Sequence, residues 1–169
     1  MLQHHALSPQ EVQQIAGKPI SVFKYSDLVN FQTINDLFTT SNFILLLYET
    51  KQNSGHWCCL INKPKVIEFF DPYAFIPDDQ LEFANIKFRK CNSMELPYLT
   101  YLMYNSNKTI DYNNVQLQKL AKNIQTCGYW CGIRMRESRL SNDKFAKMFI
   151  NYPVDERDNL ILKISHKYI

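Results

Sequence analysis

Glycine and tryptophan are scarce in this chain, which has only four glycines and two tryptophans among 169 residues. Long apolar runs are also lacking, since the longest spans the six residues from Phe43 to Tyr48, whereas a membrane-spanning helix needs about 20. No charge of one sign dominates, because 19 basic and 16 acidic side chains leave a formal charge of +3. We therefore expect neither a membrane protein nor a dedicated nucleic-acid-binding protein, and the length fits one domain over residues 1–169.

Cysteine is present but forms no recognisable framework. Five cysteines is an odd number in a chain long enough to fold without disulfides, and no Cys-x-x-Cys pair occurs. Cys58 and Cys59 would point to opposite faces of a strand, which disfavours a zinc site built from them with His56, Cys127 and Cys131. The first five residues lack the basic and apolar blocks of a secretory signal. We expect a protein that is not secreted, acts in a reducing compartment and holds no metal.

The local patterns predict a mixture of helices and strands. A capped helix is expected over 9–16, because Ser8, Pro9 and Glu11 match a helix start and Gly17 matches its end. The apolar run 43–49 predicts a strand covered on both faces, and 98–104 is rich in residues that favour strands. Other segments carry weaker patterns: 34–38, 81–84, 133–140 and 145–149 are expected to be helical, with an end before Pro153, and 115–124 fits a strand or a helix.

A β-hairpin is predicted where strands at 57–61 and 66–70 flank the turn-forming sequence Asn-Lys-Pro-Lys. In such a hairpin the start of the first strand lies beside the end of the second. His56 precedes the first strand and Asp71 follows the second, so the hairpin alone should bring an imidazole and a carboxylate together. Glu68 is a weaker candidate for the carboxylate, because it lies three residues short of that end.

The scarce residues gather around a histidine and a cysteine. Three of the four glycines and both tryptophans lie beside His56 or Cys131: Gly55, Trp57, Gly128, Trp130 and Gly132. Each one alone would suit a turn or the core. Their joint placement indicates a site built from the histidine and the cysteine, the pair that forms thiolate nucleophiles.

The expected chemistry needs three supporting groups. Cys131 would be activated at the start of the helix expected after Gly132, where the helix dipole favours a thiolate. Asp71 would orient the imidazole of His56 through one ring nitrogen. The main-chain N–H of Cys131 and the side-chain amide of Gln125 could both donate to an oxyanion.

Three short motifs resemble those of the adenain and ubiquitin-like-protease group of cysteine peptidases, which includes adenovirus-type maturation proteases and SUMO proteases. The motifs follow the family's order of histidine, acidic residue, glutamine and cysteine: His56-Trp57, Phe70-Asp71-Pro72-Tyr73 and Gln125-Thr126-Cys127-Gly128-Tyr129-Trp130-Cys131-Gly132. The resemblance covers about residues 43–150, and the three motifs together are more specific than any one of them.

The resemblance implies an α+β fold in which a central mixed β-sheet is flanked by helices, as in papain-like and adenain-like proteases, with the nucleophile at a helix N-terminus. It also favours a strand near 115–118. It implies roles for five residues: Cys131 as nucleophile, His56 as general base and acid, Asp71 as orienter of the histidine, Gln125 as oxyanion donor, and Trp57 as a wall beside the histidine. Trp130 departs from the family, which usually has a smaller or acidic residue there, and we expect it to form a second aromatic wall beside the nucleophile.

Two cysteines compete for the role of nucleophile, because Cys127 and Cys131 are both followed by glycine. A glutamine lies six positions before Cys131, a spacing found in the ubiquitin-like-protease branch. Six positions before Cys127 lies Ala121, which has no side-chain donor. The spacing therefore favours Cys131.

The implied function is a cysteine endopeptidase that processes capsid or other virion precursors, with no required cofactor. Fourteen lysines against five arginines suit an AT-rich genome such as that of many large viruses or virophages. Adenain-type enzymes can use a peptide or DNA as activator, and basic clusters at 87–90 and 134–139, although usually solvated faces, leave that open. The expected setting is a monomer in the host cytoplasm, viral factory or virion. Alternatives are a ubiquitin-like or SUMO-type deconjugase, a non-catalytic binding module and a related acyltransferase.

Overall fold

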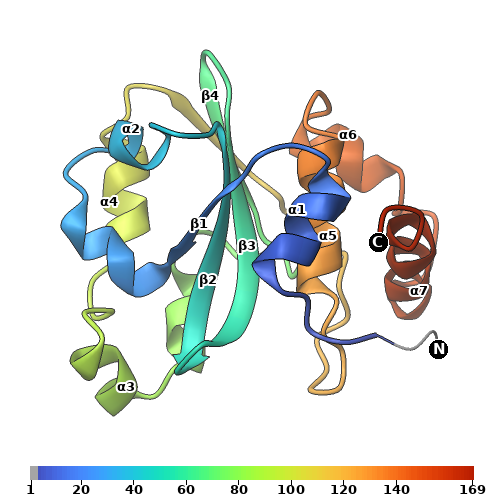
Figure 1. Ribbon diagram of the computed structural model, residues 1–169, viewed down its shortest axis with the longest axis horizontal. Coiled ribbons are helices and arrows are strands. Elements are labelled where there is room, and N and C mark those ends of the chain that lie inside the picture. The colour runs from blue at the N-terminus through green and yellow to red at the C-terminus, as the bar shows by residue number, and fades with distance from the viewer. Residues whose placement is uncertain (1–3) are drawn as a thin grey trace.

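The computed structural model describes residues 4–169 and has three layers, with a five-stranded sheet between two groups of helices (Figure 1). Residues 1–3, part of the opening stretch that lacks a secretory pattern, lie outside the described residues. Between residues 4 and 169, no helix is long and apolar enough to cross a membrane. The predicted α+β class, with a central mixed sheet flanked by helices, is confirmed.

The sheet keeps its strands in the order of the sequence: β1 (Ser21–Lys24), β2 (Phe43–Lys51), β3 (Ser54–Asn62), β4 (Val66–Phe70) and β5 (Thr109–Tyr112). The two outer pairs are parallel and the two inner pairs are antiparallel, which makes the sheet mixed. The predicted hairpin is the antiparallel pair of β3 and β4. The apolar run in β2 is buried on both faces, as its composition predicts.

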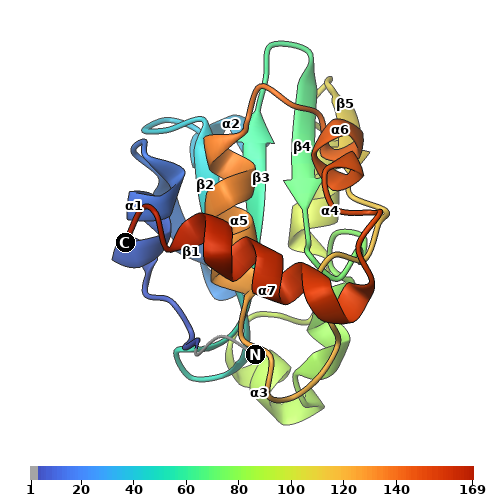
Figure 2. The same ribbon diagram turned by 90° about the vertical axis from the view of Figure 1, so that its right-hand side faces the viewer.

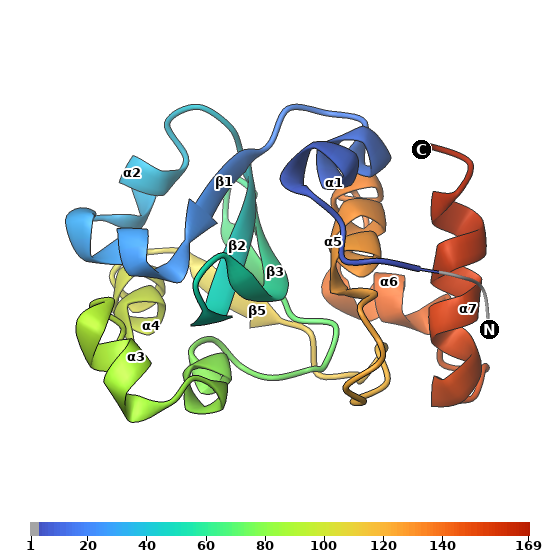
Figure 3. The same ribbon diagram turned by 60° about the horizontal axis from the view of Figure 1, so that its bottom comes forward.

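The helices divide between the two faces of the sheet (Figures 1 and 3). One face is covered by the N-terminal helix and the three C-terminal helices: α1 (Pro9–Ala16), α5 (Cys127–Arg136), α6 (Asn142–Lys147) and α7 (Val154–Ser165). The other face is covered by shorter elements: the 3₁₀ helix η1 (Tyr25–Asn30), α2 (Ile34–Leu37) and α4 (Tyr98–Tyr104). The 3₁₀ helix η2 (Asp79–Phe83) and α3 (Ile86–Cys91) lie between β4 and α4 in the chain.

Two hydrophobic cores result from the alternation of side chains along the strands. Leu45 of β2 and Cys59 of β3 contribute to the core under α1 and α5. Leu46 and Cys58 contribute to the core under η1, α2 and α4. The opposite orientation predicted for Cys58 and Cys59 is thus confirmed.

Glycine allows α1 to lie directly on α5. A Cβ atom at Gly132 would be 2.7 Å from Cγ2 of Ile15, and one at Gly128 would be 3.3 Å from Cγ2 of Val12. The start of α1 has the predicted capping box, in which the Ser8 N–H donates to Glu11 Oε2 at 2.8 Å. These two scarce glycines therefore serve helix packing.

The segment 98–104 was predicted to be a strand, and this is wrong, because it forms α4. Its apolar residues Leu99, Leu102 and Met103 follow helical spacing and are buried against the second core, while Tyr104 is exposed. Packing of this face outweighs the preference of the individual residues for strands. The strand expected near 115–118 is also absent from the described chain, since the N–H groups of 117 and 118 both donate to the carbonyl of Pro72 in a loop.

The helix expected over 133–140 begins six residues earlier, at Cys127, and ends at Arg136. This difference moves Cys131 from a helix start into the second turn. The helical stretch expected at 145–149 is α6, which begins at Asn142 after the cap residue Ser141. The expected helices at 9–16, 34–38 and 81–84 correspond to α1, α2 and η2. The helix α7, for which the sequence carried no expectation, lies across the outer side of α5 (Figure 2).

Candidate active site

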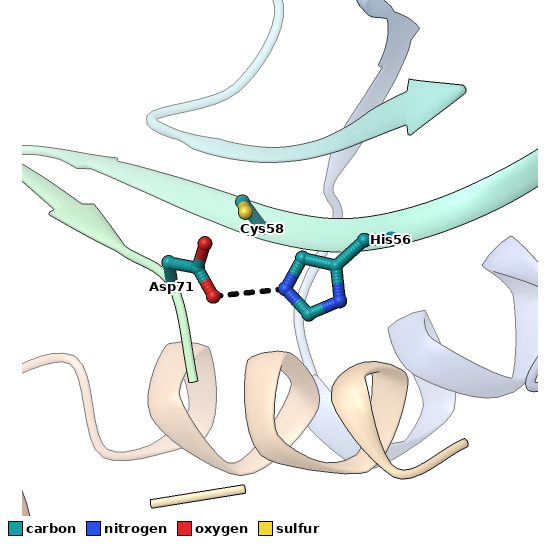
Figure 4. A group of neighbouring side chains, drawn as sticks. All are labelled: His56, Cys58 and Asp71. Atoms are coloured by element: carbon teal, nitrogen blue, oxygen red, sulfur yellow. Dashed lines mark hydrogen bonds and ion pairs between the residues drawn. The ribbon is translucent and has the colours of Figure 1, made fainter. Parts of the chain in front are cut away.

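The hairpin of β3 and β4 brings His56 and Asp71 together as predicted. His56 Nε2 and Asp71 Oδ1 are 2.8 Å apart, and both side chains are buried (Figure 4). The register pairs Cys59 of β3 with Phe70 of β4, so the strand end carrying Asp71 lies beside the segment that carries His56. Because Nε2 is used by Asp71, Nδ1 is the ring nitrogen left for a reacting group.

The carboxylate of Asp71 is fully buried and held by several donors. Oδ1 also accepts from the main-chain N–H of Tyr73, and Oδ2 accepts from Nε2 of Gln80, each at 2.8 Å. The side-chain amide of Asn113 donates to the Asp71 carbonyl at 2.9 Å. These bonds fix the carboxylate in one orientation, which in turn fixes the plane of the imidazole.

Glu68, the weaker candidate for the orienting carboxylate, has other partners. It accepts from Lys63 Nζ at 2.7 Å and from Nη2 of Arg134 on α5. Arg134 is fully buried and also donates to Asn142 Oδ1 at 3.0 Å. The expectation that Arg134 lies on a solvated basic face is therefore wrong, because the residue joins α5 to β4 through a buried ion pair.

The ring of Tyr73 stacks on the ring of His56, with centroids 4.4 Å apart and planes at 15°. A tyrosine face attracts a cation, so this contact favours the protonated imidazole. On the other side of the site, Gly55 allows β3 to approach β2 closely, because a Cβ atom there would lie 2.0 Å from the carbonyl oxygen of Tyr48. The glycine before His56 is thus required by the strand pairing.

The pKa of His56 is raised to about 10. Burial, the largest influence, acts in the opposite direction, since it disfavours the charged ring. The charge of Asp71, its hydrogen bond and the interaction with the Cys127 side chain outweigh burial. His56 is consequently an imidazolium at neutral pH.

Cys127 is the cysteine that meets this imidazolium. It is the first residue of α5 and lines a cleft of about 590 Å³ together with His56. The side chain of the preceding residue, Thr126, does not cap the helix, so it does not occupy the first main-chain N–H groups of α5. Cys127 therefore lies at a helix N-terminus and beside the imidazolium of His56.

Cys131 does not lie in the cleft, contrary to the expectation that it faces His56. It is fully buried in the second turn of α5, where its Sγ lies 3.4 Å from the carbonyl oxygen of Trp57 as a hydrogen-bond donor. Burial, followed by the neighbouring Cys59 side chain, raises the pKa of the Cys131 thiol well above its ordinary value. Cys131 is therefore held as a protonated core thiol.

Three glutamines line the cleft: Gln80, which donates to Asp71, and Gln118 and Gln125, which differ in how firmly they are held. Gln125, the residue expected to donate to the oxyanion, is exposed, and its main-chain N–H donates to His4 Nε2 at 3.1 Å. Gln118 is buried, and its Nε2 donates to the Tyr73 hydroxyl at 3.2 Å. Sequence spacing missed Gln118, because it lies nine positions before Cys127 rather than six.

The two tryptophans expected to form walls of the site have different positions. Trp57 lines the cleft, and its indole N–H donates to the carbonyl of Leu7 at 3.3 Å. Trp130 does not line the cleft, because it is fully buried and packs edge-on against Phe149. The expectation of a Trp130 wall is therefore not supported, since the helix directs this side chain into the core.

One group of possible metal ligands occurs among residues 4–169. The ligand atoms of His56, Cys58 and Asp71 lie within 4.8 Å of one another (Figure 4). Burial, and then the charge of Asp71, raise the pKa of the Cys58 thiol well above its ordinary value. The thiol thus keeps its proton and hydrogen-bonds to Asp71, and His56 is bonded to the same carboxylate. The group forms a hydrogen-bond network rather than three free ligands.

The fold and the site define an α+β protein with a histidine–aspartate pair facing a cysteine at a helix N-terminus. A search of protein families finds no family model that matches the chain. The chain is 33% identical over 143 residues to the uncharacterized protein V9 of Sputnik virophage, covering 84% of this chain and 82% of that protein. It belongs to the same family as this virophage protein.

Two solved structures share the arrangement only loosely. The central domain of the uncharacterized Lpg1148 protein from Legionella pneumophila has a TM-score of 0.43 at 14% identity, with 97% of this chain and 96% of that chain covered. ChlaDub1 from Chlamydia trachomatis has a TM-score of 0.40 at 11% identity, with 93% and 73% covered.

Proposed function

We propose that this protein is a cysteine endopeptidase that cleaves capsid or other virion precursor proteins during virus maturation. One observation carries the proposal: His56 is bonded to buried Asp71 through Nε2 and interacts with Cys127 at the start of α5, inside an open cleft. This arrangement contains the nucleophile, the acid and base, and the orienter that thiol catalysis requires.

In the proposed reaction, the Cys127 thiolate attacks the carbonyl carbon of the scissile peptide bond. The imidazolium of His56 gives its proton to the leaving amine as the C–N bond breaks, which leaves a thioester on Cys127. Neutral His56 then takes a proton from water while the water oxygen attacks the thioester. Release of the acid product breaks the C–S bond and restores the thiolate and the imidazolium.

The tetrahedral intermediate needs donors for its oxyanion, and we assign Gln118 and the main-chain N–H of Cys127 to this role. Gln118 lines the cleft, is almost fully buried and is held on Tyr73, which itself stacks on His56. Nε2 of Gln118 donates to the Tyr73 hydroxyl at 3.2 Å and to the Ile124 carbonyl at 3.4 Å, and the longer bond would be exchanged for one to the oxyanion as charge develops. Gln125 is the less suitable donor, since its side chain is exposed.

A viral substrate is supported by the relationship to a virophage protein. Among the described residues that line the cleft, only His56 and Lys122 carry a basic group, and no acidic side chain is present. Trp57 and Leu120 give the cleft apolar walls. Such walls suit an extended, uncharged peptide with a small residue before the cut bond, which we propose as the substrate segment.

The proposed reaction requires no metal or organic cofactor, because the chain supplies each reacting group. We propose that the protein acts as a monomer in the host cytoplasm, the viral factory or the virion. The basic residues of α3, Lys87, Arg89 and Lys90, are the candidates for a nucleic-acid activator, whereas buried Arg134 is not available for one. An activating peptide is the other possibility carried by the family resemblance.

The function can be tested with the capsid protein encoded by the same genome. We expect the wild-type protein to cut it at discrete sites after a small residue, and Cys127→Ala to leave it intact. Conjugates of ubiquitin-like modifiers form a second set of substrates. Cleavage of these conjugates without cleavage of virion proteins would favour the deconjugase, and binding of virion proteins without any cleavage would favour a binding module.

A further inference from the structure

The helix α7 places one buried carboxylate behind the candidate active site. Asp158 is almost fully buried, and each of its oxygens accepts hydrogen bonds from neutral groups. Oδ1 accepts from the hydroxyl of Thr126 at 2.5 Å and from the indole N–H of Trp130 at 3.0 Å. Oδ2 accepts from the main-chain N–H of Lys119 at 2.9 Å.

The three donors belong to the segments that carry the proposed reacting groups. Thr126 directly precedes Cys127, and Trp130 lies one turn further along α5. Lys119 directly follows Gln118, the proposed oxyanion donor. One carboxylate therefore ties the start of α5 to the loop that carries Gln118, and it does so from α7, which lies across α5 in Figure 2.

The bond between Thr126 and Asp158 replaces the usual capping bond at the start of α5. Thr126 occupies the N-cap position of α5, where a threonine hydroxyl usually accepts from a main-chain N–H of the first turn. Here the hydroxyl donates to Asp158 and makes no cap bond. The first turn of α5 thereby keeps its N–H groups for the thiolate and the oxyanion, while the carboxylate holds the turn in place.

Burial of a carboxylate is costly unless donors satisfy it, and no basic side chain pairs with Asp158 among the contacts of the described chain. A neutral or apolar residue could join α7 to α5 at lower cost. A carboxylate can instead accept three bonds at fixed angles from two segments. Its geometry suits precise placement of those segments relative to each other.

We propose that Asp158 is a positioning residue, which sets the separation between Cys127 and Gln118 by holding Thr126 and Lys119 on one carboxylate. This inference rests on the proposed function of the site. A displacement of about 1 Å between reacting groups can cost about 100-fold in rate. Loss of the Asp158 contacts should therefore reduce turnover without preventing substrate binding.

The variants Asp158→Asn and Thr126→Val test the positioning role. The asparagine has the size of aspartate but cannot accept from all three donors, and the valine has the shape of threonine without its hydroxyl. We expect each to lower kcat on a peptide substrate by about 10- to 100-fold per titrated active site, with KM changed little. Thr126→Ser keeps the hydroxyl and should restore most of kcat.

Asp155→Asn is the matched control. Asp155 lies one turn before Asp158 on α7 and also holds Lys119, but through an exposed ion pair to Nζ at 2.6 Å. Such a pair contributes little, so the control should keep wild-type kcat. Circular dichroism and thermal unfolding should show all four variants folded at the assay temperature. A kcat per folded active site that is unchanged in both Asp158→Asn and Thr126→Val would overturn the positioning role.

Alkylation of Cys127 by iodoacetamide separates this inference from the proposed function, because it requires no substrate. At neutral pH we expect Thr126→Val to slow alkylation by about twofold to fivefold, since the thiol is less well placed at the helix terminus. Asp155→Asn should alkylate at the wild-type rate. Slower alkylation in a protein that cleaves nothing would support the positioning role and count against the peptidase, whereas an unchanged rate in Thr126→Val would count against positioning alone.

Discussion

Cys127 and Cys131 lie one turn apart on α5, yet the first borders the cleft beside His56 and the second is enclosed between α5 and β3. The two cysteines lie on the same helix, and each is followed by a glycine. They differ in what surrounds them, because Cys127 meets an imidazolium and Cys131 meets the carbonyl of Trp57 and the thiol of Cys59. The surroundings, rather than the local sequence, distinguish the proposed nucleophile from a core thiol.

Iodoacetamide should therefore modify Cys127 faster than the other four cysteines at neutral pH. The reason is that the thiolate reacts, and burial holds the pKa of Cys131 well above its ordinary value. Peptide mapping by mass spectrometry after short exposures gives the order of labelling. Cys127→Ala should lower kcat by about 10⁶-fold, while Cys131→Ala should remain active and lose only stability. Preferential labelling of Cys131 would contradict this assignment and identify Cys131 as the nucleophile.

Gln118→Ala should lower kcat by about 100- to 1000-fold, because it removes one donor to the oxyanion. Gln125→Ala is the matched control, since Gln125 also lines the cleft but is exposed, and it should stay within a few-fold of wild type. Steady-state kinetics on one peptide substrate gives both values. If the two variants exchanged these effects, the oxyanion donor would be Gln125.

The alkaline limit of activity should be set by His56. Its pKa of about 10 means that the ring keeps its proton through neutral pH, so kcat/KM should fall as the pH rises through about 10. In Asp71→Asn the charge that raises this pKa is lost and burial lowers it. We expect the alkaline limb to move to lower pH and kcat to fall by about 10⁴-fold. A pH–rate profile with an unmoved alkaline limb in Asp71→Asn would contradict the role of the pair.

The same pair should make stability depend on pH. The folded-state pKa of His56 is raised above its ordinary 6.5, so the proton binds the folded state more tightly than the unfolded state. The stabilisation is complete below about pH 6.5 and is lost as the pH rises through about 10. Urea unfolding of the wild type should show a free energy of unfolding that declines over this range. Asp71→Asn should show a smaller decline.

Gly132→Ala should destabilise the protein by about 1–3 kcal/mol, because the added methyl group meets Ile15 where α1 lies on α5. Urea denaturation measures the change. Combining it with Ile15→Ala creates room for the methyl group, so the double variant should lose less stability than the sum of the two single variants. Strict additivity would mean that the glycine serves some purpose other than the close approach of the helices.

The sequence correctly predicts the part of the site that is formed by residues close together in the chain. A hairpin of two strands and a four-residue turn brings His56 and Asp71 together with no information from distant segments. The proposed nucleophile, Cys127, could not be chosen from such local information. The start of α5 is set by packing on α1, through Gly128 and Gly132, which have low intrinsic preference for helices.

Two other residues were missed for different reasons. Gln118 lies in a loop whose path is set by hydrogen bonds to Pro72, and a fixed count back from a cysteine does not capture such a path. Asp158 lies on α7, 26 residues beyond Gly132, where the last motif ends, and carries no local pattern that points to Thr126. For α4 the signal was present, since Leu99, Leu102 and Met103 have helical spacing, but the strand preference of the tyrosines obscured it.

The place of Asp158 in the sequence has a consequence for the order of events during synthesis. Cys127, His56 and Asp71 emerge from the ribosome before residue 158, and the segments around Thr126 and Lys119 lack their common acceptor until α7 has emerged and docked. A nascent chain therefore carries all three reacting side chains before it can align them. Alignment of the proposed site therefore follows the synthesis and docking of α7, and a chain that has not reached residue 158 lacks the bonds that hold Thr126 and Lys119 together.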